Sequence, residues 1–144
     1  MNYKAILLFL CAILYGDIHV FNRSAGTESE IKALSNTGAL YISAKDLARS
    51  FTSKIYENAE RKKIVLYISG VKVKISGNSS YIIIDEDAYQ MPEITIVRQG
   101  DLYLPAEYFL GLLKSTILPG INFDGKKELL EIDVIRFNIT DIDI

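Results

Sequence analysis

Residues 40–48 read LYISAKDLA, and residues 102–110 read LYLPAEYFL. The two stretches agree closely in their order of apolar, aromatic and small residues. A second pair follows, because NAERKK at residues 58–63 resembles NFDGKK at residues 122–127, and a strand-like apolar run comes after each. A repeat of this length predicts two copies of one supersecondary unit.

Each copy is predicted to contain one amphipathic helix. Ser43 is a favourable helix N-cap, and Asp46 three residues later completes a capping box. In the second copy Pro105 stands at the first helical position, where a helix tolerates proline. Apolar residues then recur at i, i+3, i+4 and i+7, which is one face of a helix packed on a core. These faces are Ala44, Leu47, Ala48 and Phe51 in the first copy and Ala106, Phe109, Leu110 and Leu113 in the second.

Between the two helices the apolar period changes to two, which predicts an antiparallel meander. A two-residue turn at Ser69-Gly70 fixes the register of the first hairpin. A turn at residues 77–80 extends the sheet, and Asp85-Glu86-Asp87 ends the next strand. One face then carries Ile64, Leu66, Ile68, Val71, Val73, Ile75, Ile82 and Ile84, and the other carries Val65, Tyr67, Lys72 and Lys74. The predicted fold class is α+β: an antiparallel sheet or meander with two helices, built from a duplicated strand–helix–strand unit.

The N-terminus has the features of a secretory signal. Lys4 precedes an apolar run of 11 residues, 5–15. A membrane span needs about 20 apolar residues, whereas a signal core needs about 7–15. Residues 1–16 are therefore predicted to be a signal peptide, and the chain to be exported to the periplasm or cell envelope. Two alternatives stay open. The segment is an uncleaved anchor, which would be the chain's membrane contact, or Cys11 carries a lipid anchor. Residues 17–37 are polar and are interpreted as a linker or a first strand.

The composition limits the kinds of binding and catalytic site that the chain can form. The chain has 16 basic and 18 acidic residues, a net charge of −2, which gives no basic footprint for nucleic acid. Its one cysteine, Cys11, and its one histidine, His19, both lie near the N-terminus. The rest of the chain therefore lacks thiol nucleophiles and the ligands of most zinc or copper sites. Asp85-Glu86-Asp87 is interpreted as a solvated turn, with calcium binding as the alternative. No catalytic residue, cofactor or metal site is predicted.

Residues 103–106 (YLPA) and 124–127 (DGKK), with the weaker copy at residues 41–44 (YISA), resemble the copper amine oxidase N-terminal-like family, also called the stalk domain, of bacterial envelope proteins. The resemblance covers residues 38–134. It implies a module similar to a non-catalytic portion of the oxidase, without its copper ligands. Such modules resemble the front end of N-acetylmuramoyl-L-alanine amidases, which cut peptidoglycan and also carry an AMIN domain. Residues 135–144 resemble the first strand of an AMIN domain, and are either its start or a tail.

The candidate binding face consists of Tyr67, Lys72, Lys74 and Tyr81, which the predicted register places on the outer side of the meander. Aromatic rings beside cations suit sugar rings or acidic polymers. Two functions follow from these observations. The chain is either a non-catalytic envelope module that binds or positions a partner at the cell wall, or a protein–protein interaction or spacer (stalk) domain without polymer affinity. Its partner is accordingly a cell-wall polymer or an envelope protein.

Overall fold

The computed structural model describes residues 16–51 and 53–133. The predicted signal peptide, apart from Gly16, and the predicted tail at residues 135–144 lie outside these residues. No helix among the described residues is long and apolar enough to span a membrane. The described elements, in chain order, are β1 (Ile18–Asn22), β2 (Thr27–Ile31), β3 (Ala33–Asn36), β4 (Ala39–Ser43), α2 (Ala44–Ser50), β5 (Lys54–Asn58), β6 (Lys63–Ile68), β7 (Val71–Ser76), β8 (Tyr81–Ile84), β9 (Asp87–Gln90), β10 (Ile96–Arg98), β11 (Asp101–Pro105), α3 (Ala106–Thr116), β12 (Ile121–Asp124) and β13 (Leu129–Ile132).

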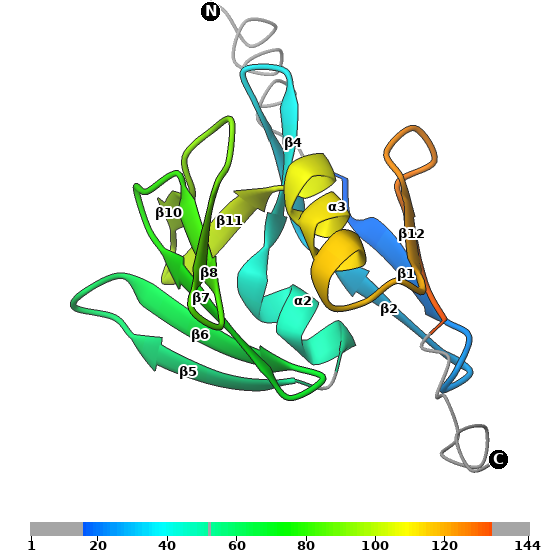
Figure 1. Ribbon diagram of the computed structural model, residues 1–144. Helices are drawn as coiled ribbons and strands as arrows, with labels where there is room; N and C mark the ends of the chain where they lie inside the picture. The colour runs from blue at the N-terminus through cyan, green and yellow to red at the C-terminus, as the bar shows by residue number, and fades with distance from the viewer. Residues whose placement is uncertain (1–15, 52, 134–144) are drawn as a thin grey trace, which may run out of the picture.

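The strands form three sheets around the two helices (Figure 1). Sheet A has the order β12-β13-β1-β2, sheet B the order β10-β11-β4-β3, and sheet C the order β5-β6-β7-β8-β9. The paired strands are antiparallel, apart from β1 and β13, which run parallel. The predicted α+β class, with mostly antiparallel strands and two helices, is confirmed.

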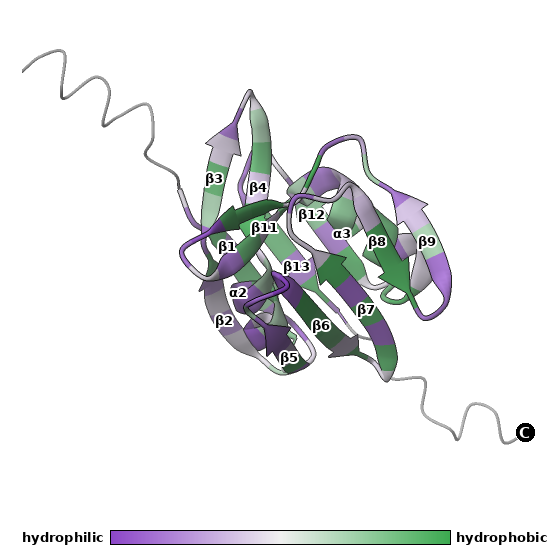
Figure 2. Ribbon diagram, turned by 90° about the vertical axis from the view of Figure 1, so that its left-hand side faces the viewer, coloured by the Kyte–Doolittle hydropathy of each residue, from purple (hydrophilic) through white to green (hydrophobic). Residues whose placement is uncertain are grey.

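Sheet C has the predicted meander register. Tyr67 lies opposite Lys72 and Ile68 opposite Val71 across the β6–β7 turn. Ser69 and Gly70 have φ values of 51° and 78°, and positive φ at both central residues is the geometry of a type I′ hairpin turn. The second predicted turn is also confirmed, because Ile75 lies opposite Ile82. Figure 2 shows the resulting alternation of hydrophobic and hydrophilic bands along β7.

Residues 17–37, interpreted as a linker or a first strand, form β1, β2 and β3, which belong to sheets A and B. The sequence signal was weak because β2 exposes four of its five residues, so it has no apolar alternation. Strand β5 was missed for the same reason, since all five of its residues are exposed. Both strands lie at sheet edges, where pairing with one neighbour replaces burial of a face.

Each helix lies between two hairpins. The β3–β4 hairpin precedes α2 and the β5–β6 hairpin follows it; β10–β11 and β12–β13 flank α3 in the same order. The duplication of this unit stays a prediction. Strands β4 and β11, which carry the two most similar stretches of sequence, pair with each other.

The β5–β6 and β12–β13 turns align differently in the structure than in the sequence match of residues 58–63 with residues 122–127. Asn58 Oδ1 accepts the N–H of Arg61 at 3.1 Å, and Asp124 Oδ1 accepts the N–H of Lys127 at 3.2 Å. Asn58 therefore takes the place of Asp124, whereas the sequence comparison paired it with Asn122. The pairing by identity was wrong because this turn is defined by the side chain that accepts the backbone N–H.

The two helices begin in different ways. Ser43 Oγ accepts the N–H of Asp46 at 3.0 Å, so the predicted N-cap is confirmed. The capping box does not form, because the Asp46 carboxylate accepts the N–H of Lys32 at 2.8 Å and the Ser43 N–H donates to the Lys32 carbonyl. Pro105 is the N-cap of α3 and the last residue of β11, one position before its predicted place.

The helices bury the predicted apolar faces in one core. Leu47 of α2 and Phe109 of α3 are fully buried, and Phe51 at the end of the first face is partly buried. Gly77 marks the place where sheet C meets sheet B. A Cβ atom there would overlap Val97 Cγ2, and the next residue, Asn78, donates its N–H to the Thr95 carbonyl at 2.8 Å.

Candidate functional site

The outer face of sheet C carries all four residues of the predicted binding face. Tyr67 on β6 lies opposite Lys72 on β7, and Lys74 lies opposite Val65. Tyr81 begins β8, and it lies opposite Gln90 of β9. The alternate residues of β6, β7 and β8 point into the core, so these four side chains point away from it.

Strand β5 adds two residues that the sequence analysis missed. Lys54 lies opposite Tyr67, on the side away from Lys72. The ring of Tyr56, 58% exposed, meets the Tyr67 ring edge-on, with centroids 5.7 Å apart and an angle of 80°. Ile55 and Tyr56 are residue types that favour strands, which was the signal available in the sequence. We call Lys54, Tyr56, Tyr67 and Lys72 the Tyr–Lys cluster.

Lys72 lies on the opposite side of Tyr67 from Lys54. Its Nζ atom lies 5.9 Å from the centroid of the Tyr67 ring, a cation–π distance. The Lys72 N–H donates to Asp85 Oδ1 at 3.3 Å, which fixes the backbone near the start of β7. Tyr67 is therefore held by an aromatic edge on one side and a cation on the other, with part of its surface open to solvent.

Tyr81 lies apart from this cluster. It starts β8, next to the end of β7, whereas Lys72 is near the start of β7. The register places Tyr81 beyond Ile75 and Ile82, about 14 Å along the strands from Lys72 at ~3.4 Å per residue. The structure thus brings Tyr67 and Lys72 together, places Lys74 in the middle of the face, and leaves Tyr81 at its far end.

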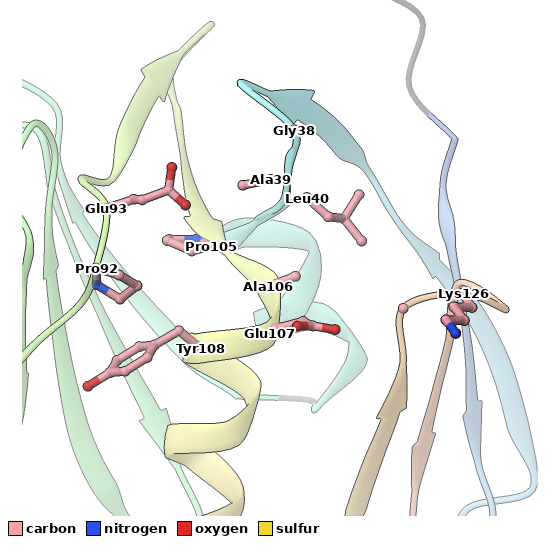
Figure 3. Close-up of a pocket in the computed structure, with 11 residues that line it drawn as sticks. Gly38, Ala39, Leu40, Pro92, Glu93, Pro105, Ala106, Glu107, Tyr108 and Lys126 are labelled. Carbon is pink, nitrogen blue, oxygen red and sulfur yellow. The ribbon is translucent and has the colours of Figure 1, made fainter.

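A second candidate is an open pocket of about 630 Å³ above the start of α3 (Figure 3). Glu93 comes from the segment before β10 and Lys126 from the β12–β13 turn, on either side of Pro105 and Glu107. Glu107 lies against this turn, with Oε1 3.2 Å from the Cβ position of Gly125. The pocket therefore offers two carboxylates, one amine and the Tyr108 phenol, and its lining residues include no serine, cysteine or histidine.

Tyr41 is a buried residue of β4, which belongs to sheet B. It is 1% exposed, and its hydroxyl donates to the Ile94 carbonyl at 3.1 Å. Burial raises the pKa of Tyr41 above its ordinary value of 10.0, and the negative charge of Glu93 adds to the increase. Burial thus favours the neutral form of the phenol, which packs with Leu34 and Tyr103 in a small cluster of its own.

Buried acids at the start of α2 have structural roles. Asp101 accepts hydrogen bonds from the Ser43 hydroxyl and from the backbone N–H groups of Lys45 and Leu102, at 3.2 Å and 2.7 Å for the last two. Asp46 pairs with Lys32 and Arg49. The Asp101 carboxylate satisfies the N–H of Lys45, in the first turn of the helix, which has no partner within the helix, and so holds β11 against α2. The Asp46 carboxylate instead accepts the N–H of Lys32, between β2 and β3.

The described residues include no group of three or more histidine, cysteine, aspartate or glutamate side chains that could hold a metal ion. His19 Nε2 on β1 instead lies 2.9 Å from Glu28 Oε1 on β2. Asp85 and Glu86 form the exposed β8–β9 turn, and Asp87 begins β9. The solvated-turn interpretation of these residues stays a prediction.

Comparison with known protein families matches residues 21–118 to the copper amine oxidase N-terminal domain. The match covers more than half of the 144 residues. The chain belongs to this family. The matched segment of the copper amine oxidase N-terminal domain runs from the middle of β1 to just beyond α3, and it includes all of sheets B and C. The N-terminal domain of this family is non-catalytic. No curated protein and no solved structure gives a significant match.

Proposed function

We propose that this chain is a non-catalytic module of the cell envelope, and that it binds or positions a partner at the cell wall. The family assignment supports a role without catalysis. The apolar run behind Lys4 supports export. The observation that carries the proposal is the outer face of sheet C, where Tyr67, Lys72 and Lys74 point to solvent together.

The chemistry of this face fits peptidoglycan. The tyrosine rings offer flat apolar surfaces on which sugar rings can stack, and the stem peptides present carboxylates to lysine. Exposed charge pairs contribute about 1 kcal/mol or less and are screened by salt. We therefore expect the tyrosines to supply the larger part of the binding free energy.

We also infer that the chain is the N-terminal part of a peptidoglycan amidase and that its two hairpin–helix–hairpin segments arose by duplication. The likeness of residues 135–144 to an AMIN strand supports the first inference. The pairing of β4 with β11, which carry the matching stretches, supports the second. Sequencing the gene downstream tests the parentage: an in-frame AMIN and amidase region is expected, and an immediate stop codon would contradict it.

Sedimentation with insoluble peptidoglycan tests the binding role. The purified chain is expected in the pellet at low salt and less of it at high salt. A Tyr67→Ala, Tyr81→Ala double variant should stay in the supernatant while keeping the wild-type melting temperature. If the wild-type chain stays in the supernatant at low salt, the wall-binding proposal fails and the spacer function replaces it.

A further inference from the structure

The outward strand positions of sheet C carry lysines and no carboxylates, although the whole chain is slightly acidic. The chain has a net charge of −2, yet the charged residues at the outward positions of β5, β6 and β7 are Lys54, Lys63, Lys72 and Lys74. The carboxylates of this sheet do not occupy these outward positions. Glu57 is on the inward side of β5, where it pairs with Lys45 at 3.0 Å, and Asp85, Glu86 and Asp87 at the β8–β9 turn line an open pocket together with Lys72 and Lys74.

Within the described part of the chain, the charges of these lysines are not paired with carboxylates, although Lys72 also contacts the Tyr67 ring. None of them forms an ion pair with a carboxylate within residues 16–51 and 53–133, in contrast to Lys32 and Lys45. A cation without an internal partner contributes nothing to the fold through charge pairing. A row of such cations on one face sets up a positive local potential that attracts anionic ligands.

The Tyr–Lys cluster combines this charge with stacking surfaces in a fixed geometry. Lys54, Tyr67 and Lys72 form one row across β5, β6 and β7. Neighbouring strands lie about 4.8 Å apart, so the two lysine positions are about 10 Å apart with a tyrosine between them. Tyr56 lies beside Tyr67 and extends the aromatic surface along β5.

We propose that the Tyr–Lys cluster is a site for peptidoglycan strands whose stem peptides carry free carboxylates. The sugar rings lie on Tyr56 and Tyr67, and the carboxylates pair with Lys54 and Lys72. The inference rests on the proposed function and adds to it in two ways. It centres the contact on β5 and β6, away from Tyr81, and it makes the negative charge of the wall polymer a requirement for binding.

Chemical modification of the polymer tests the charge requirement with the purified full chain. Peptidoglycan is compared before and after carbodiimide amidation, which neutralises its carboxylates and leaves its sugars intact. Amidation should weaken retention about two- to thirtyfold, the effect of losing two exposed charge contacts. Treatment with hydrofluoric acid, which removes phosphodiester-linked polymers, should leave retention unchanged. Equal retention on amidated material, or loss after hydrofluoric acid treatment, would overturn the inference.

Matched variants test the location. Tyr56→Ala and the pair Lys54→Gln, Lys72→Gln should each lower retention about twofold or more. Phe21→Ala, an aromatic residue 38% exposed on sheet A, and the pair Lys126→Gln, Lys127→Gln should retain wild-type binding. A variant enters the comparison only if its melting temperature equals that of the wild-type chain. Wild-type retention by both cluster variants overturns the inference and leaves the proposed function standing, whereas failure of the wild-type chain to sediment overturns the proposed function itself.

An oligonucleotide control separates this ligand from polyanions in general. Single-stranded DNA offers negative charges and rings that stack on aromatic side chains. We expect the chain to prefer unmodified peptidoglycan, and oligonucleotide to compete poorly at low salt. Equal competition by DNA would show a general polyanion surface and would overturn the assignment to the wall polymer.

Discussion

Ile42 of β4 lies directly opposite Leu104 of β11, and both side chains are fully buried. The two residues hold the same position in the two similar stretches of sequence. Their strands are antiparallel, so each stretch pairs with the other around this central point. The pair also joins the hairpin before α2 to the hairpin before α3.

Truncation of this pair is expected to destabilise the fold strongly. Ile42→Ala and Leu104→Ala should each lower the free energy of unfolding by about 2–5 kcal/mol, because each leaves a cavity in the core. The double variant should deviate from additivity by at least about 0.5 kcal/mol, since the residues are neighbours. Chemical denaturation measures all three, and the exposed Glu107→Ala serves as a control within about 0.5 kcal/mol. A loss below about 1 kcal/mol at either site would contradict the buried pair.

Two glycines are expected to respond in opposite directions to alanine. Gly77→Ala should lower the free energy of unfolding by about 1–3 kcal/mol, because the added Cβ would overlap Val97. Gly111 lies in α3 with nothing within 4 Å of its Cβ position. Gly111→Ala should therefore raise the free energy of unfolding by about 0.4–1 kcal/mol. Thermal unfolding of both variants checks this, and equal shifts of the same sign would contradict the contact between sheets B and C.

Local sequence patterns predicted the elements whose structure is decided locally. The β6–β7 hairpin follows from Ser69-Gly70 and from the alternation of residues 64–75, and the helix start at Ser43 follows from its capping hydroxyl. Elements decided by distant pairing were not predictable in this way. Strand β1 pairs with β13 from the other end of the domain, and the exposed edge strands β2 and β5 show no alternation of burial.

The candidate site was predicted in part for the same reason. Tyr67, Lys72 and Lys74 follow from the hairpin register, which needs one turn. Tyr56 and Lys54 depend on β5, which the pattern of residues 54–58 does not reveal. The positive charge of the face was also hidden, because the net charge of the chain averages over carboxylates that lie in turns and on other surfaces.

Stability should fall at alkaline pH through Tyr41. Its pKa in the folded chain lies above the ordinary value of 10.0 because the phenol is buried. The neutral Tyr41 phenol therefore makes its full contribution to the free energy of unfolding below pH 10. This contribution is lost as the pH rises through the folded pKa, since Tyr41 ionises at a lower pH in the unfolded chain. Denaturation at rising pH should show a smaller decrease for Tyr41→Phe than for the wild-type chain. Tyr81→Phe, at an exposed position, should follow the wild-type curve, and identical curves for all three would contradict this role of Tyr41.

Export is expected to remove the N-terminal segment. The apolar run at residues 5–15 has the length of a signal core, so the mature chain should begin near Asp17. N-terminal sequencing of the protein recovered from the periplasm or medium measures this directly. A product that stays in the cytoplasm and keeps Met1 would contradict the prediction.

The most direct test of the central claim is to map the contact surface of the exported chain by NMR, using soluble peptidoglycan fragments with free stem carboxylates. We expect chemical-shift changes that grow with fragment concentration in β5, β6 and the start of β7, around Tyr56, Tyr67 and Lys72. The pocket at Glu107 and Lys126 should keep its free chemical shifts. Changes centred on that pocket, or none on sheet C, would contradict the account.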